Sequence, residues 1–132
     1  MGQQGFICRG KKFYLEWSSE NKVLTLMVEG DHVRKDAEEF GIGFDDFFKK
    51  ISVPETLNML IDATKLRKSD HESRRVYAEI AKRISKNKKG KIALCSANVF
   101  VRVVGNFIIM AARGDIKMKI FSNAKEGLGW FK

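Results

Sequence analysis

The sequence has few of the residues on which several classes of protein depend. Its 132 residues include two cysteines, one proline and two histidines. Cys8 and Cys95 are too few for the disulfide framework of a small secreted protein, which favours a reducing, cytoplasmic location. The amino terminus lacks the apolar core of a signal peptide. The longest apolar run, within residues 99–112, is interrupted by Arg102 and Asn106 and is too short to span a bilayer.

Patterns typical of enzymes are also missing. His32 and His71 are isolated in polar segments, and no Cys/His cluster has the spacing of a metal site. Gly41 and Gly43 lack the lysine and the strand–loop–helix context of a phosphate-binding loop. We therefore predict a protein that is not an enzyme and that uses no metal or cofactor.

Acidic residues are outnumbered by basic ones, 16 to 25, which leaves a net charge of +9. Such an excess favours anionic partners, or it serves only to keep the protein in solution. Nucleic-acid binding usually adds aromatic stacking or a recognition helix, and neither accompanies the lysine clusters, so we do not expect a nucleic-acid partner. The candidate contacts to an anionic membrane surface are Lys65, Arg67, Lys68, Lys86, Lys88 and Lys89.

The hydrophobic patterns predict an α/β domain. Residues 12–17 and 23–29 alternate between apolar and polar side chains, and the turn-forming residues 18–22 join them into a hairpin. Strands and helices then alternate, which favours right-handed crossovers and a parallel sheet. The predicted order is ββαβαβαβα, in a single domain over residues 11–132 with a mostly parallel five-stranded sheet, an antiparallel edge hairpin and helices packed on it. The later strands are predicted at 56–61, 92–96 and 117–121, and the later helices at 69–88, at 97–113 and after a cap at Asn123.

Two segments are predicted to be less regular. Residues 1–10 read as a flexible arm. Residues 31–52 read as a helix broken at Gly41 and Gly43, because each glycine weakens a helix by about 1 kcal/mol. The break is either an ordinary kink or the hinge of a lid. Ser69 and Glu72 match a capping box that opens the next helix.

The predicted helix at 97–113 is the most apolar part of the chain, and its polar residues form one narrow stripe. One face packs on the sheet, and the rest, with the phenylalanines of 40–48, forms a second apolar surface. This surface predicts a pocket for an apolar small molecule or lipid, covered by residues 31–52. The alternative is an interface with a second copy or a protein partner. The candidate ligand-binding residues are Phe44, Phe47, Phe48, Phe100, Val104, Phe107 and Ile108.

Several short phrases resemble one family of bacterial domains. The phrases are Leu60-Ile-Asp62, the Arg-rich helix after it, Lys91-Ile-Ala-Leu94, Arg102-Val-Val-Gly105 and Phe121…Leu128-Gly-Trp-Phe131. Together with the element order over residues 12–131, they resemble the SpoIIAA-like family of STAS-like domains. The resemblance implies the fold described above. It also implies two kinds of function: anti-sigma-factor antagonists switched by phosphorylation, and relatives resembling the CRAL–TRIO lipid-transfer fold that bind apolar ligands or membranes.

The antagonist motif can be compared residue by residue. It reads Asp-Ser-Ser/Thr-Gly at a helix start, and its first hydroxyl accepts the phosphate. Here Ala63 follows Asp62 and Lys65 replaces the glycine, which leaves Thr64 and Ser69 as phosphosite candidates. The leading prediction is therefore a non-enzymatic module that binds an apolar or lipid-like ligand, cytoplasmic and peripheral at the anionic inner face of the membrane. The alternative is a protein-interaction regulator resembling an anti-sigma-factor antagonist without the usual phospho-serine.

Overall fold

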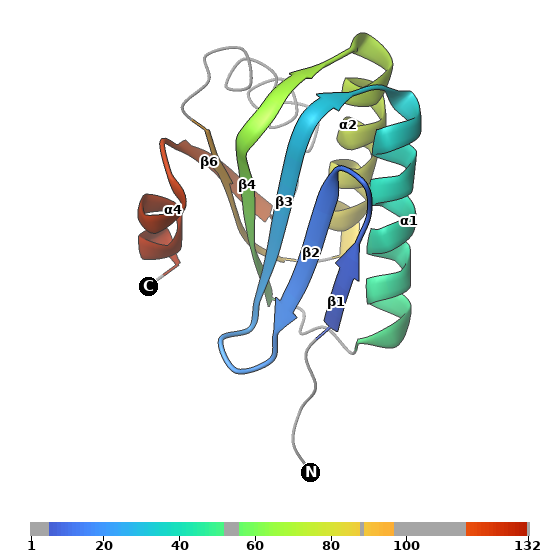
Figure 1. The fold of residues 1–132 in the computed structure, drawn as a ribbon. Helices are drawn as coiled ribbons and strands as arrows, with labels where there is room; N and C mark the ends of the chain where they lie inside the picture. The colour runs from blue at the N-terminus through green and yellow to red at the C-terminus, as the bar shows by residue number, and fades with distance from the viewer. Residues whose placement is uncertain (1–5, 52–55, 88, 97–115, 132) are drawn as a thin grey trace.

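A mixed sheet organises the part of the chain that the computed structural model describes, namely residues 6–51, 56–87, 89–96 and 116–131. Helices lie on both of its faces (Figure 1). The strands are β1 (Phe6–Arg9), β2 (Phe13–Ser18), β3 (Val23–His32), β4 (Thr56–Ser69), β5 (Lys89–Cys95) and β6 (Ile116–Phe121), and the helices are α1 (Arg34–Lys50), α2 (His71–Asn87) and α4 (Ala124–Trp130).

The six strands lie side by side in chain order. β1, β2 and β3 are antiparallel neighbours, and β3, β4, β5 and β6 are parallel. This confirms the predicted α/β class with an antiparallel edge. The sheet has one strand more than predicted, because residues 6–9 form β1 instead of part of a flexible arm. Its pairing with β2, with Cys8 opposite Leu15, is a backbone interaction that four residues with little hydrophobic pattern do not reveal.

α1 and α2 cover one face of the sheet, and α1 runs without a break from Arg34 to Lys50. The prediction of a broken helix was wrong, because both glycines are buried where the helix meets its neighbours. A Cβ added to Gly43 would lie 3.1 Å from a ring carbon of Phe13, and one added to Gly41 would lie 3.4 Å from Ile80 Cδ1. Gly43 therefore allows α1 to pack closely on Phe13, whereas a methyl group at Gly41 would make ordinary van der Waals contact.

The opposite face carries α4, which begins as the sequence predicts. Asn123 Oδ1 accepts a hydrogen bond from the Glu126 backbone N–H at 3.0 Å. The helix packs on a small apolar cluster formed by Leu60, Ala93 and Cys95. Trp130 and Phe131 contact the same cluster, so the last residues of the helix are held against β4 and β5.

Two glycines provide a test of this architecture. Gly90 in β5 has φ +133°, and a Cβ there would overlap the Leu57 carbonyl oxygen of β4. We expect Gly90→Ala to lower the free energy of unfolding by about 3 kcal/mol, because both the backbone and the strand pairing must shift. Urea denaturation measures the change.

Gly129→Ala is the matched control, because nothing lies within 4 Å of its added methyl group. We expect that variant to stay within about 1 kcal/mol of the parent protein, with a stabilising sign. Equal midpoints for the two variants would contradict the close approach of β5 to β4.

Candidate binding site at the carboxyl edge of the sheet

β3 and β4 are longer than the other strands and continue past the end of β5. Met27, Asp62 and Cys95 are neighbours across the three strands, after which β3 continues to His32 and β4 to Ser69. We call this two-stranded extension, residues 28–32 and 63–69, the β3–β4 ribbon. Figure 1 shows it curving over the upper end of the molecule towards the starts of α1 and α2. The carboxyl ends of parallel strands are where α/β proteins commonly bind ligands, so this edge is the candidate site.

Two register shifts in the pairing of β3 with β4 shape the ribbon, and at each of them β4 has one residue more than β3. They lie between Met27 and Glu29 and between Gly30 and Asp31. Gly30 has φ +76°, a left-handed conformation that glycine adopts without strain. His32 and Ser69 are paired at the end of the ribbon, and both are buried. The polar segment around His32 looks exposed in the sequence, but the inward alternation of Leu24, Leu26 and Val28 reaches residue 32 when it is continued.

His32 is the centre of a buried polar cluster, with 1% of its surface exposed. Its Nε2 lies 3.1 Å from the Glu29 carbonyl oxygen and 3.3 Å from that of Lys12, so we assign the ring proton to Nε2. Nδ1 then accepts a short hydrogen bond from the Tyr77 hydroxyl. Burial lowers the pKa of His32, and burial also raises the pKa of Tyr77. The cluster is thus neutral and joins β3 to α2.

Lys12 and Asp36 extend the cluster to α1. The Lys12 ammonium lies 3.2 Å from Asp36 Oδ2 and donates to the Asp31 carbonyl oxygen at 2.6 Å. Asp36 also accepts the Val33 backbone N–H at 2.9 Å, which caps the first turn of α1. Burial opposes ionisation of Asp36, but the Val33 N–H and the Lys12 ammonium outweigh it and lower the pKa of the carboxyl group.

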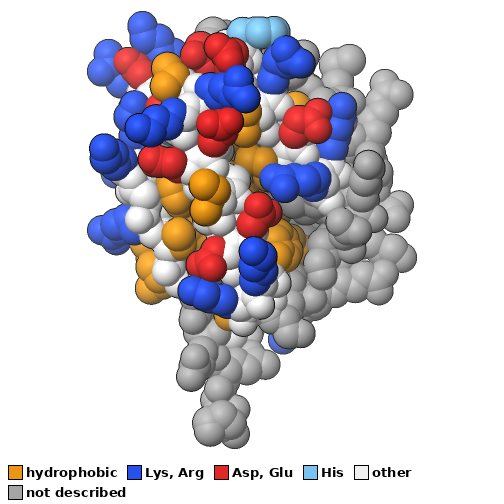
Figure 2. Space-filling view, turned by 90° about the vertical axis from the view of Figure 1, so that its right-hand side faces the viewer, with side chains coloured by type: hydrophobic (Ala, Val, Ile, Leu, Met, Phe, Trp, Pro, Cys, Tyr) orange, Lys and Arg blue, Asp and Glu red, His pale blue; other side chains and the backbone are white. Residues whose placement is uncertain are grey.

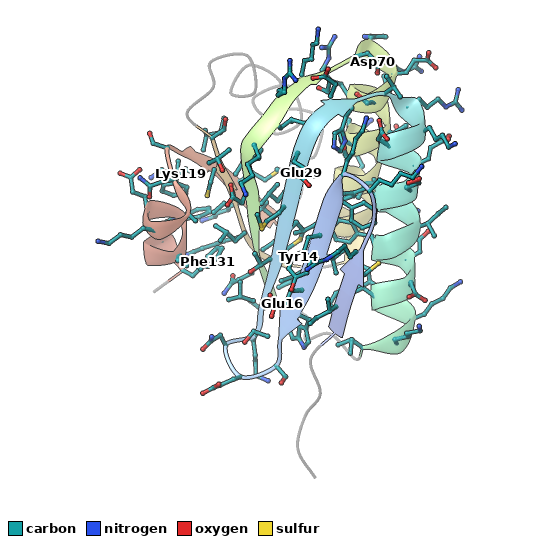
Figure 3. The ribbon with its side chains drawn as sticks, viewed as in Figure 1. Tyr14, Glu16, Glu29, Asp70, Lys119 and Phe131 are labelled. Atoms are coloured by element: carbon teal, nitrogen blue, oxygen red, sulfur yellow. The ribbon has the colours of Figure 1, made fainter. Side chains whose placement is uncertain are left out.

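The start of α2 differs from the sequence prediction. The capping residue is Asp70, whose Oδ1 accepts the Ser73 backbone N–H at 2.8 Å. Figure 3 shows Asp70 at the turn from β4 into α2. Ser69 is instead the last residue of β4 and is 5% exposed, so the predicted capping box is wrong. A phosphate on Ser69 would require the ribbon to open first.

Thr64, the other phosphosite candidate, also lies in an unexpected setting. The run Asp62-Ala-Thr-Lys65 sits inside β4, not at a helix start. Thr64 donates through its hydroxyl and its backbone N–H to Asp62 Oδ1, at 2.6 and 3.0 Å. A phosphate here would face the Asp62 carboxylate without a helix amino terminus to stabilise it. The side chain is exposed, and phosphorylation at this position stays a prediction.

The outer side of the ribbon carries a cluster of basic residues, with Glu29 and Asp31 opposite Lys65 and Lys68 in the strand pairing. Lys65, Arg67 and Lys68 are all exposed, as the lysine cluster predicts. Arg67 lies 3.7 Å from Asp31, whereas neither Lys65 nor Lys68 has an ion pair with another described residue. Half-exposed Val33 lies at the same edge, directly after His32. The predicted contacts Lys86, Lys88 and Lys89 lie outside the residues whose side chains the structure describes.

The predicted apolar residues divide into two groups. Phe44 and Phe47 are fully buried, and the Phe47 ring packs 5.7 Å from that of Trp17 in the main core. Phe48 is half-buried against the same cluster. These side chains fill the space between α1 and the sheet, so their packing does not support a free apolar surface over α1. The other predicted ligand contacts, Phe100, Val104, Phe107 and Ile108, lie outside the described residues.

Figure 2 shows the face formed by α1 and α2, where basic and acidic side chains alternate and apolar side chains occur only in small patches. Within the described ranges, no three His, Cys, Asp or Glu side chains are grouped as a metal site would need. In the same ranges, no helix is long and apolar enough to cross a membrane.

Comparison with known proteins identifies the fold. No family model matches this chain, and no curated protein matches it. The comparison with solved structures shows that this chain has a SpoIIAA-like fold. An uncharacterized protein of the DUF3478 family from Shewanella loihica PV-4 is similar over 100% of this chain and 98% of its own, with 18% identity and a TM-score of 0.67. This similarity confirms the fold that the short phrases and the element order predict.

The buried histidine predicts a specific dependence of stability on pH. Burial lowers the folded-state pKa of His32. Below pH 6.5 the histidine is therefore protonated in the unfolded chain while it stays neutral in the folded chain. Stability contributed by His32 is therefore present above pH 6.5 and is lost as the pH falls below it. We expect this one group to lower the free energy of unfolding between pH 7 and pH 5, by at most about 1.4 kcal/mol for each pH unit below 6.5.

The measurement is urea denaturation at both pH values for the parent protein, His32→Gln and His71→Gln. His71 is exposed at the first position of α2 and is the matched control. His32→Gln should have the smaller loss between the two pH values, and His71→Gln should keep the loss of the parent. The same loss in all three proteins would show that His32 does not titrate as its burial requires.

Proposed function

We propose that this chain is a non-enzymatic binding module that docks on anionic membrane surfaces through the basic side of the β3–β4 ribbon. The single observation that carries the proposal is the pair of exposed lysines, Lys65 and Lys68, which make no ion pair with another described residue, although Glu29 and Asp31 lie opposite them in the strand pairing. They lie beside Arg67, whose exposed ion pair with Asp31 contributes little and exchanges readily with another anion.

The surroundings of these lysines support an anionic partner. α1 and α2 both begin at this edge, although the carboxylates of Asp36 and Asp70 already cap their first turns. Lys35 in the first turn of α1 adds a further exposed cation. Each basic residue near an acidic membrane contributes about 1 kcal/mol, so three or four of them give measurable binding. Val33 supplies a small apolar side chain at the same edge.

The non-enzymatic part of the proposal follows from how the polar residues are used. His32, Tyr77 and Ser73 are the groups at this edge that resemble catalytic residues. Their hydrogen bonds go to one another and to backbone carbonyls: Ser73 Oγ donates to the Asp70 carbonyl at 2.9 Å, and Tyr77 donates to His32. His32 and Ser73 are at most 1% exposed, so a substrate would not reach them in this conformation.

A second candidate is a protein-interaction regulator, for which the SpoIIAA-like fold is the favouring observation. The same basic edge would then contact an acidic protein surface. An apolar ligand, the other part of the sequence prediction, depends on residues 97–113, which the structure does not describe.

Co-sedimentation with lipid vesicles tests the proposal. We expect the full chain to bind phosphatidylcholine vesicles that contain phosphatidylserine and to dissociate from them at high salt. We expect no binding to vesicles of phosphatidylcholine alone. Lys65→Glu/Lys68→Glu should weaken binding by about tenfold or more, because two attractive charges become repulsive. Lys22→Glu/Lys125→Glu changes the net charge equally at two other exposed sites and should bind almost as the parent does.

The other results each have a meaning. Salt-resistant binding to both kinds of vesicle would indicate apolar insertion and favour the lipid-ligand prediction. Binding that both double variants weaken equally would reduce the effect to net charge. Absence of binding would overturn the membrane proposal and leave the protein-interaction regulator.

A further inference from the structure

The first strand of the sheet leaves one backbone edge open in the described part of the chain. β1 is terminal in the strand order and pairs only with β2. In an antiparallel edge strand, alternate residues direct both the N–H and the C=O away from the sheet, where they pair with water or with another strand. The opposite edge, β6, carries the exposed residues Lys117 and Lys119, a common protection against further pairing. β1 carries only Arg9 in this role, beside Ile7, which is 64% exposed.

A groove of about 520 Å³ runs beside this edge, between β1 and α1. Its strand side is formed by Cys8, Gly10 and Phe13, and its helix side includes Ile42, which is 68% exposed, and Gly43. The groove therefore has an apolar floor next to unpaired backbone groups. An edge strand beside a helix, with a groove between them, is the arrangement in which sheets accept an extended peptide as an added strand.

The rim of the groove is acidic although the chain is basic overall. Glu39, Asp45 and Asp46 line it, with Lys49 as the only cation among the described lining residues. Glu39 has no ion pair with another described residue. Asp45 and Asp46 lie 3.5 Å from Arg83 and 3.3 Å from Lys50, in exposed pairs that contribute little and exchange readily. Charge complementarity therefore favours a positively charged occupant.

We propose that β1 accepts an added strand from a partner polypeptide whose extended segment has an apolar residue with a lysine or arginine two positions to either side. Residues two apart share one face of a strand. The apolar side chain thus sits on Phe13 and Ile42 while both cations face the acidic rim. The intervening side chains lie on the opposite face of the sheet, the face of Tyr14 and Glu16 (Figure 3). This surface is separate from the basic ribbon, so the proposal stands or falls independently of membrane binding.

Cys8 provides a probe inside the groove. The chain has two thiols, and Cys95 is fully buried with its pKa raised by burial to about 11, so it reacts slowly. Cys8 is half-buried and lines the groove. The rate at which iodoacetamide alkylates Cys8 therefore measures whether the groove is occupied.

The experiment uses the full chain with the capped peptide Lys-Thr-Val-Thr-Lys. We expect saturating peptide to slow Cys8 alkylation by about tenfold and to shift backbone amide resonances of β1 in NMR spectra. The peptide Glu-Thr-Val-Thr-Glu should do neither, because it meets the acidic rim with like charge. Two N-methylated forms of the lysine peptide test the backbone pairing. Methylation at both threonines removes the N–H groups on one edge of the extended peptide, and methylation at the valine removes the N–H group on the other edge. One of the two forms should lose binding.

Two variants locate the contact. Glu39→Lys should weaken the peptide's apparent affinity by about tenfold, whereas Glu20→Lys, an exposed position in the turn between β2 and β3, should leave it unchanged. The proposal is overturned if the lysine peptide leaves Cys8 reactive, or if both N-methylated peptides bind as well as the parent peptide. Protection of Cys8 that rises with protein concentration alone, together with dimers in analytical ultracentrifugation, would assign the edge to a second copy of the chain and would also overturn it.

Discussion

The parallel pairing of β3 with β4 is the interaction on which the rest of the described structure depends. These strands are the longest in the sheet and share more close contacts than any other pair of elements. Their carboxyl ends deliver the chain directly into α1 and α2, so the register of one pair positions both helices on the same face. Ser73 Oγ donates to the Asp70 carbonyl and the Asp70 N–H donates to the His32 carbonyl, which ties the two turns together. A shift in this register would displace His32, the basic residues and both helix starts at once.

The two faces of the ribbon serve different purposes. Its inner side holds neutral polar groups, of which His32, Tyr77 and Ser73 have hydrogen-bond partners within the protein, whereas the buried Ser69 hydroxyl has none among the described residues. An unpaired polar group in such a position costs about 1–3 kcal/mol. Its outer side holds lysines whose ammonium groups remain in water. The inner cluster therefore supports the edge, and the outer cations are the groups that a partner can reach. Lys65 and Lys68 make no ion pair with another described residue, so their ammonium groups can pair with an anionic surface.

The aromatic residues of α1 show how packing changes a functional interpretation. Phe40, Phe44 and Phe47 suggest an apolar surface when they are read along the sequence. In the structure they meet Phe13, Trp17 and Tyr77 from the sheet and from α2, with ring centres 5–6 Å apart between successive neighbours. The same residue types occur in a protein core and in an apolar ligand site, and only their neighbours in the fold distinguish the two. Gly43 is a similar case, because the sequence suggests a helix break there, whereas in the structure it allows α1 to pack closely on Phe13.

The α/β class, the hairpin, the alternation of strands and helices along the chain and the Asn123 cap could be predicted from the sequence, because each of these depends on local periodicity or on side chains a few residues apart. The sixth strand, the unbroken α1, the capping of α2 by Asp70 and the burial of His32 became clear only in the folded protein. Each of the latter depends on contacts between distant residues: Cys8 opposite Leu15, Gly43 against Phe13, and His32 beneath Tyr77. Local patterns indicate which residues prefer to be buried, whereas the bulges of β4 and the pairing of β1 decide which residues are buried in the fold.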